Sequence, residues 1–236
     1  MLSVITIITT ASPSWDETRR FVLAVAAYQA SRNCTIELIV VDDLRVLSGV
    51  AQVGQLAPDV LVKLFVPEVK GQLDSGIRAL AHAKGELIVT IDPDMHENLA
   101  DIDRFVEKQI SGCSLVYGVR VARGDVSRTR VWISRLYNTI VRRVFLLSVH
   151  DINTPMLLLS AEIVPEILGY DGRFGLVKVY FPYVLGARFA EVKIEVSGMS
   201  KASSYSYLRL AGFMFRQLLG LSAFLVFRLG LRRHAA

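Results

Sequence analysis

Short apolar runs alternate with amphipathic segments along the chain, and this alternation predicts strands and helices that follow one another. Runs rich in Ile, Leu, Val and Thr predict strands at 3–9, 35–41, 61–65, 86–91, 114–118, 156–159 and 191–196. Helical periodicity covers 71–83, 99–110 and 131–147, and one more helix is expected to begin at Ser12 with Pro13 in its first position. This alternation indicates an α/β fold, with a mostly parallel sheet that helices cover on both faces.

One predicted strand leads directly into three residues of the types that bind metals. The apolar segment 86–91 is followed by Asp92, Asp94 and His96 at alternate positions. Alternate side chains of an extended segment lie on one side, and α/β proteins bind ligands at the carboxyl ends of parallel strands. Two carboxylates suit Mg²⁺ or Mn²⁺, and an imidazole favours Mn²⁺. The alternative is a solvated turn in which Asp92 or Asp94 caps the next helix.

A second pair of carboxylates ends the predicted strand 35–41. Asp42 and Asp43 follow its apolar run directly. Acidic side chains at the carboxyl end of such a strand accept hydrogen bonds from ribose hydroxyls or from a base edge. An acidic pocket of the receiver-domain kind has similar residues, but that fold ends near half this length. The pair therefore favours nucleotide binding.

The order of these motifs along the chain resembles that in glycosyltransferase family 2, which consists of inverting enzymes with the GT-A fold. The resemblance is strongest to dolichyl-phosphate mannosyltransferase and related polyprenyl-phosphate sugar transferases. The matching segments are Val40-Val41-Asp42-Asp43, Gly76-Ile77, Ala83-Lys84-Gly85-Glu86 and Asp92-Pro93-Asp94-Met95-His96. The resemblance extends over residues 3 to about 160. It implies a Rossmann-like GT-A domain, assigned here to residues 1–200, and a donor sugar linked to GDP or UDP.

The resemblance also implies roles for individual residues. Asp92 and Asp94 are similar to the aspartate pair whose metal binds the donor diphosphate, with His96 as a further ligand. The residues expected to be catalytic are Asp92, Asp94 and Arg120. The residues assigned to the donor are Thr9, Glu17, Asp42, Asp43, Asp92 and Lys201. Those assigned to the acceptor phosphate are Arg120, Arg128, Arg130 and Arg135, since guanidinium groups pair bidentately with phosphate oxygens.

The sequence departs from the resembled family in two segments. The family's Pro-x-Tyr-Asn-Glu loop is replaced by residues 9–17, in which Glu17 is the remaining acid, while Trp15 either stacks on the base or packs on the helix. The late Arg-x-x-Gly-x-Ser-Lys motif survives as residues 198–201, with Glu195 where arginine is expected. The Gln-x-x-Arg-Trp signature of processive synthases is absent, which favours transfer of a single sugar.

Positive charge is concentrated at the C-terminal end of the sequence. The formal net charge is +5, whereas residues 196–236 contain no acidic side chain and carry basic ones among many apolar residues. This pattern predicts a basic amphipathic helical tail over 201–236 that contacts an anionic membrane surface. Packing on the domain or in a homo-oligomer is the alternative. Nothing resembles a nucleic-acid-binding module.

Hydropathy places the expected membrane contact at the surface of the bilayer. Hydrophobic residues make up 52% of the chain. No run of about 18 uninterrupted apolar residues predicts a transmembrane helix. The first ten residues lack the basic head of a secretory signal and are predicted as a strand. We therefore expect a cytoplasmic protein, peripheral at the inner face of the cell membrane.

A lipid phosphate is the expected acceptor because its oxygen is already ionised at neutral pH and needs no general base. The expected reaction is metal-dependent transfer of one sugar to polyprenyl phosphate, with inversion at the anomeric carbon. Two alternatives stay open. In the first, the acceptor is a hydroxyl of a cell-surface glycan or membrane glycolipid, and Asp171 is the general base. In the second, the chain is a sugar-nucleotide-binding module without turnover.

Overall fold

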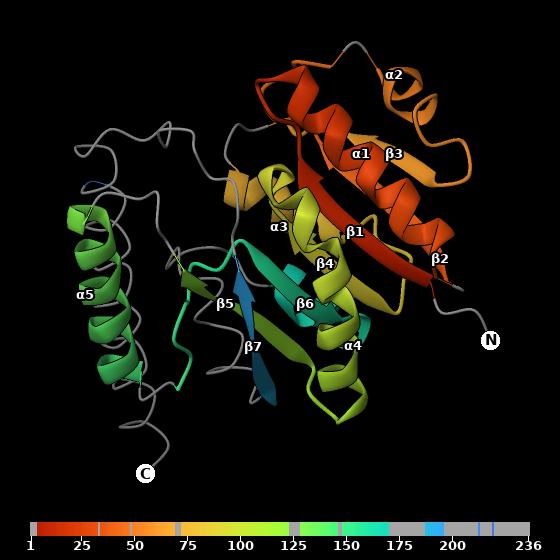
Figure 1. Ribbon diagram of the computed structural model, residues 1–236. Helices are drawn as coiled ribbons and strands as arrows, with labels where there is room; N and C mark the ends of the chain where they lie inside the picture. Colours follow the sequence, from red (N-terminus) through yellow and green to blue (C-terminus); the bar gives the residue numbers. More distant parts are fainter. Residues whose placement is uncertain are drawn as a thin grey trace.

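The computed structural model describes residues 4–32, 34–47, 49–68, 72–122, 128–145, 148–169 and 187–195, together with Gly212 and Leu219. These segments form a seven-stranded sheet flanked by helices (Figure 1). The strands are β1 (Val4–Thr10), β2 (Thr35–Val41), β3 (Leu61–Phe65), β4 (Leu87–Ile91), β5 (Leu115–Ala122), β6 (Met156–Ser160) and β7 (Phe189–Glu195). Their order across the sheet is β3-β2-β1-β4-β6-β5-β7.

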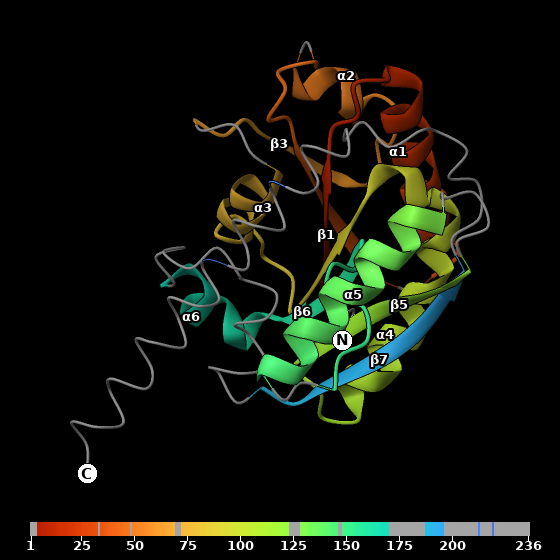
Figure 2. The same ribbon diagram turned by 90° about the vertical axis from the view of Figure 1, so that its left-hand side faces the viewer.

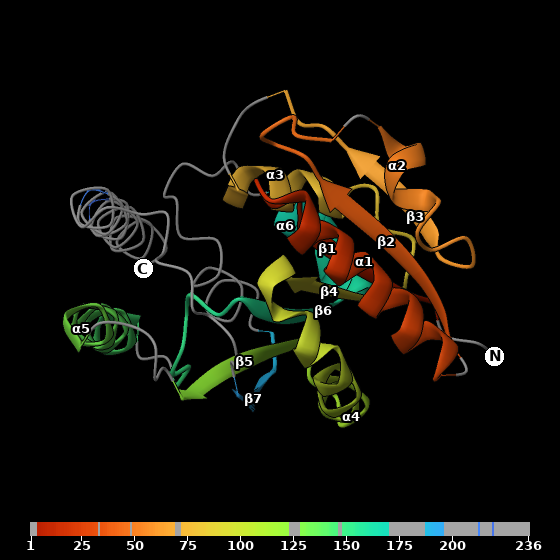
Figure 3. The same cartoon turned by 45° about the horizontal axis from the view of Figure 1, so that its top comes forward.

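Helices cover both faces of this sheet (Figure 3). They are α1 (Trp15–Ala30), α2 (Val50–Gly54), α3 (Gln72–Leu80), α4 (Ile102–Ile110), α5 (Arg128–Phe145) and α6 (Val164–Leu168), with 3₁₀ helices η1 (Pro93–Asp101) and η2 (Ala161–Ile163). One apolar cluster joins the sheet to α1, η1 and α4, and a second joins it to α3, α5 and α6. Neighbouring strand residues enter opposite clusters, as Ile7 and Ile8 do, which explains the nearly continuous apolar runs.

Strand direction decides which loops meet at each edge of the sheet. β1 pairs in parallel with β2 and β4, β2 with β3, and β5 with β7, whereas β6 pairs antiparallel with β4 and β5. Of the seven described strands, β6 alone therefore runs in the opposite direction. The carboxyl ends of β1, β2, β4 and β5 consequently lie at the same edge as the beginning of β6.

The mostly parallel α/β sheet expected from the sequence is confirmed, with shifts of a few residues at the strand ends. The expected helix start is wrong. α1 begins at Trp15 after Ser14, and Pro13 precedes the helix. The Ser12 hydroxyl donates to the Glu17 carboxylate and accepts from the Ser14 N–H, so Ser12 organises the turn before α1 instead of capping it.

Of the 201–236 tail, the structure describes only Gly212 and Leu219, so the tail's helical form and its boundary at residue 200 stay predictions. Within the described ranges, no helix has both the length and the apolar character needed to cross a bilayer.

A buried carboxylate fixes the connection that leads from α3 into β4. Glu37 is fully buried and accepts hydrogen bonds from the Thr6 hydroxyl at 2.6 Å, from the Lys84 backbone N–H at 2.8 Å, and from the Lys63 ammonium. Thr6 Oγ1 in turn accepts from the Gly85 N–H at 2.9 Å. A Cβ at position 85 would lie 2.6 Å from the Thr6 backbone nitrogen, so only glycine fits this close approach.

Replacing Glu37→Gln is expected to lower the melting temperature by roughly 4–8 °C, which corresponds to about 2 kcal/mol for a chain of this size. The neutral amide cannot accept three hydrogen bonds or balance the Lys63 charge. Calorimetry of the two proteins measures the change, with Glu107→Gln on the exposed surface of α4 as matched control. Equal melting temperatures for the two variants would show that the network does not stabilise the fold.

Candidate active site

Three charged side chains come to one edge of the sheet from three different strands. Glu17 follows β1 in the first turn of α1, Asp94 follows β4 in η1, and Arg120 lies near the carboxyl end of β5. The charges of Glu17, Arg120 and His96 all act on the Asp94 carboxyl. These four residues therefore share one electrostatic environment, although they are far apart in the sequence.

The Asp94 carboxylate is destabilised where it stands. Burial raises the pKa of the Asp94 carboxyl above its usual value, and the negative charge of Glu17 raises it further. The backbone N–H of Asp94, together with the charges of His96 and Arg120, acts in the opposite direction. This environment favours a bound cation, because a cation stabilises the ionised form of Asp94.

The three residues of the predicted metal motif do not belong to one extended loop. Asp92 occupies the N-cap position of η1 without a side-chain capping bond, and Asp94 and His96 belong to η1 itself. Asp92 is extended, and Met95 between Asp94 and His96 has non-helical backbone angles, so the three residues follow neither an extended loop nor a regular 3₁₀ helix. Among the side chains that the structure describes, no three His, Cys, Asp or Glu residues are grouped closely enough to hold a metal ion. Within the described residues these side chains therefore do not form a complete metal cage, and their role as ligands stays a prediction.

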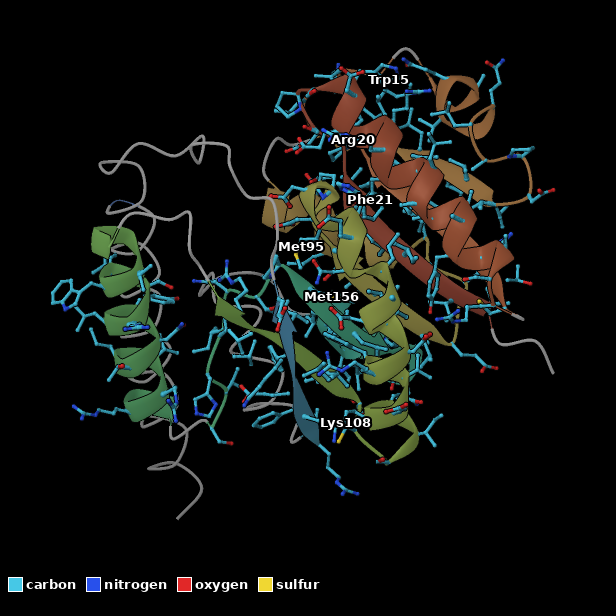
Figure 4. All side chains as sticks on the ribbon, in the orientation of Figure 1. Trp15, Arg20, Phe21, Met95, Lys108 and Met156 are labelled. Atoms are coloured by element: carbon cyan, nitrogen blue, oxygen red, sulfur yellow. The ribbon has the colours of Figure 1, made fainter. Side chains whose placement is uncertain are left out.

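Apolar packing beneath the site holds η1 in place. Met95, with φ −101° and ψ 29°, is buried in the same cluster as Phe21 of α1 and Met156 of β6 (Figure 4). The backbone N–H of Asp92 donates to the Pro155 carbonyl at 3.2 Å and joins the start of η1 to the segment before β6. The core thus fixes the backbone that carries Asp94.

An ion pair orients the Arg120 guanidinium. Arg120 Nε donates to Asp151 Oδ2 at 2.7 Å, and its Nη2 donates to Asp151 Oδ1 at 2.9 Å and to the Asn153 carbonyl at 3.2 Å. Asp151 is 3% exposed. Bidentate pairing of this kind fixes the plane of the guanidinium as well as its position. The segment before β6 therefore determines how the cation from β5 faces the site.

The residue before Asp151 is held from a different strand. His150 donates its backbone N–H to the Glu191 carboxylate of β7, and His150 Nδ1 lies 2.8 Å from Glu191 Oε2. This contact was not predictable from the sequence, because the two residues are 41 positions apart and belong to no local motif. Residues 150 and 151 are consequently fixed by β7 and β5 together.

Three of the candidate nucleotide residues lie near the carboxyl ends of β1 and β2: Thr9 belongs to β1, and Asp42 and Asp43 follow β2. Asp42 is buried, and its two carboxylate oxygens accept from the backbone N–H groups of Val46 at 2.8 Å and Leu47 at 2.9 Å. Asp42 therefore shapes the turn after β2, and Asp43 is the next residue in that turn. Thr9, near the end of β1, has a buried hydroxyl that makes no hydrogen bond. These residues remain candidates for the donor site.

The expected acceptor residues are divided between the sheet and a helix. Arg120 belongs to β5, whereas Arg128, Arg130 and Arg135 belong to α5, which stands at the side of the molecule beside β5 (Figures 1 and 2). Arg135 is exposed on α5. Lys201 and Asp171 lie outside the described residues. The charge of Arg120 acts on the Asp94 carboxyl.

Replacing Asp151→Asn is expected to lower the free energy of unfolding by about 2 kcal/mol, since the amide retains a single acceptor oxygen and places an NH₂ group against the guanidinium. Urea denaturation measures the change. Asp59→Asn, at an exposed position, is the matched control and is expected to change stability by less than about 0.5 kcal/mol. A stability loss no greater than in the control would mean that the Arg120 pair does not hold this segment.

Comparisons with known proteins agree with this architecture. The model of the family "Glycosyl transferase family 2" matches residues 3–168. An undecaprenyl-phosphate 4-deoxy-4-formamido-L-arabinose transferase of Pseudomonas aeruginosa is 30% identical over 150 residues, which are 61% of this chain and 42% of that protein. The protein of the same name from Klebsiella pneumoniae is 27% identical over 150 residues, again 61% of this chain and 44% of that protein. The chain spans less than half the length of these relatives.

Solved structures confirm the expected GT-A fold. Glucosyl-3-phosphoglycerate synthase from Mycobacterium tuberculosis is similar with a TM-score of 0.61 at 18% identity, over 94% of this chain and 79% of that one. Mannosyl-3-phosphoglycerate synthase from Rubrobacter xylanophilus is similar with a TM-score of 0.63 at 13% identity, over 94% of this chain and 74% of that one. The family match spans the sheet from β1 to β6 and includes the candidate site at its edge. The chain belongs to glycosyl transferase family 2.

Proposed function

We propose that this chain transfers a single sugar from a nucleotide-linked donor to a polyprenyl phosphate, with inversion and with Mn²⁺ or Mg²⁺ as cofactor. The observation that carries the proposal is the grouping of Asp94, Glu17 and Arg120 at the carboxyl edge of the sheet. Carboxylates beside a fixed guanidinium suit a metal-bound diphosphate, which needs both a cation and a donor of hydrogen bonds.

The acceptor class is suggested by the relatives. Those from Pseudomonas aeruginosa and Klebsiella pneumoniae bear names that specify undecaprenyl phosphate. A similar structure, glucosyl-3-phosphoglycerate synthase from Mycobacterium tuberculosis, was determined in complex with Mn²⁺ and UDP-glucose. These names support a lipid phosphate acceptor and a divalent metal for this chain, whereas the choice between UDP and GDP and the identity of the sugar stay open.

The donor set around η1 fits a divalent cation that is shared with a substrate. Asp94 is partly buried beside the negative charge of Glu17, and the His96 Nδ1 atom is buried without a hydrogen bond. Asp92 and Asp94 would hold the metal, with His96 as the further candidate ligand. Mg²⁺ is commonly held by one or two carboxylates together with substrate phosphates and water, so a complete cage of side chains is not required.

Negative charge on the leaving diphosphate is the main electrostatic demand of this reaction. When bound, the metal supplies Lewis-acid stabilisation of that charge. Arg120, oriented by Asp151, donates to the departing phosphate oxygens, and Lys201 is the second cation proposed for this purpose. Thr9, Asp42 and Asp43 are proposed to contact the nucleoside from the ends of β1 and β2.

The acceptor phosphate needs positioning rather than deprotonation. Its oxygen is already ionised at neutral pH, and attack on the face opposite the leaving group inverts the anomeric centre. The α5 residues Arg128, Arg130 and Arg135 are proposed to bind this phosphate together with Arg120. Such an acceptor resides in a membrane, so we propose a location at the membrane surface on its cytoplasmic side, and the basic tail 201–236 is proposed to share that contact.

The direct test incubates the full chain with Mn²⁺ or Mg²⁺, a short-chain polyprenyl phosphate and a panel of UDP- and GDP-sugars. We expect release of nucleoside diphosphate and a lipid whose mass has increased by one sugar residue. Transfer to a soluble hydroxyl acceptor without any lipid phosphate would contradict the proposed acceptor. Nucleotide binding without release, with every acceptor, would contradict the transferase itself and favour a binding module.

Replacing Asp94→Asn is expected to lower kcat by about 10²–10³-fold, because the metal and the leaving group lose a charged partner. The melting temperature is expected to stay within a few degrees, since burial already disfavours the ionised carboxylate. Steady-state release of nucleoside diphosphate measures the effect. Glu97→Gln, an exposed neighbour on η1, is the matched control, and equal activity of both variants would contradict the role of Asp94.

A further inference from the structure

Five exposed residues form one stripe along α5. They are Trp132, Arg135, Leu136, Thr139 and Arg143. At 100° per residue these positions fall within an arc of about 100° around the helix. Tyr137 and Val141, which are buried in the second apolar cluster, lie on the opposite side. The helix therefore packs on the domain through one face and presents this stripe to the outside.

The composition of the stripe is unusual for a surface exposed to water. Trp132 is 63% exposed and Leu136 is 43% exposed, and the two are one helical turn apart. Arg135 and Arg143 lie beside them, and the 18 residues of α5 include no aspartate or glutamate. Large apolar side chains and cations on one face, without acidic residues, are typical of helices that lie in the interface of an anionic bilayer.

We infer that the outward stripe of α5 docks on anionic lipid headgroups, with Trp132 inserted at the level of the interface and Arg143 paired with a lipid phosphate. This inference deepens the proposed function and rests on it, because a polyprenyl phosphate acceptor resides in a membrane. Charge complementarity selects a lipid surface over a second copy of the chain, since two copies of α5 would place arginines against arginines.

The position of α5 relates the docked surface to the candidate site. The helix begins six residues after β5 ends, and it stands beside the end of β5 that carries Arg120 (Figures 1 and 3). At 1.5 Å per residue the helix is about 27 Å long, so a helix lying flat offers an extended line of contact. Docking along this line would hold the β5 edge of the site close to the headgroups.

The chain contains two tryptophans, so fluorescence can follow Trp132 directly. Trp15→Phe leaves Trp132 as the single tryptophan, and Trp132→Phe is the matched variant that keeps Trp15. We expect the emission of Trp132 to shift to shorter wavelength with vesicles of phosphatidylcholine and phosphatidylglycerol, and not with phosphatidylcholine alone. The Trp132→Phe variant is expected to show no such shift.

Vesicle flotation measures the contribution of charge. Arg143→Gln is expected to weaken binding to the anionic vesicles by about fivefold, as is typical for one cation near such a surface. Arg19→Gln, on the exposed surface of α1, is the matched control and is expected to bind as the unmodified chain does. High salt is expected to release the chain.

Three results would overturn the inference. The first is that the chain does not bind vesicles, and the second is that it binds them without any change in the Trp132 emission. The third is a shift of the Trp132 emission that grows with protein concentration in the absence of lipid, because this would indicate that α5 contacts a second copy of the chain. Sugar transfer to a short-chain acceptor in solution is measured on the unmodified chain. If the unmodified chain docks on vesicles but transfers no sugar to this acceptor, the proposed reaction is contradicted and the docking surface stands.

Discussion

The direction of the strands is the constraint on which the candidate site depends. β4 and β5 run parallel with β1, and β6 alone among the described strands is reversed, so the ends of three strands meet the beginning of a fourth. Glu17, Asp94 and Arg120 are brought to one edge by this pairing, and the segment before β6 supplies Asp151 to orient Arg120. A different strand order would separate the acids from the cation.

Electrostatics then explains why this edge suits a charged ligand. Asp94 is partly desolvated beside the negative charge of Glu17, an arrangement that disfavours the ionised form of Asp94 in the absence of a cation. Arg120 lies in the same environment but is already paired with Asp151, so it offsets part of that charge while staying fixed in orientation. A metal-bound diphosphate brings a cation, which would lie against the carboxylates, and an anion, which would lie against the guanidinium. Its binding would therefore neutralise both kinds of charge at this edge.

Local patterns were sufficient for the fold but insufficient for the geometry of the site. Apolar runs predicted the strands, since each run lies between two apolar clusters. The placement of Asp94 and His96 was not predictable from their spacing, because the choice between an extended loop and the 3₁₀ helix η1 depends on Met95 packing against distant core residues. The Glu191 contact with His150 depends on β7 pairing with β5, and no local signal encodes it.

The proposed reaction depends on Asp94 binding a metal together with a nucleoside diphosphate at the edge of the sheet. Electron paramagnetic resonance of Mn²⁺ with the full chain, recorded with and without UDP or GDP, measures this binding. We expect nucleotide to strengthen Mn²⁺ binding and Asp94→Asn to weaken the ternary complex by about tenfold or more. Unchanged Mn²⁺ and nucleotide binding in Asp94→Asn would contradict this role of Asp94.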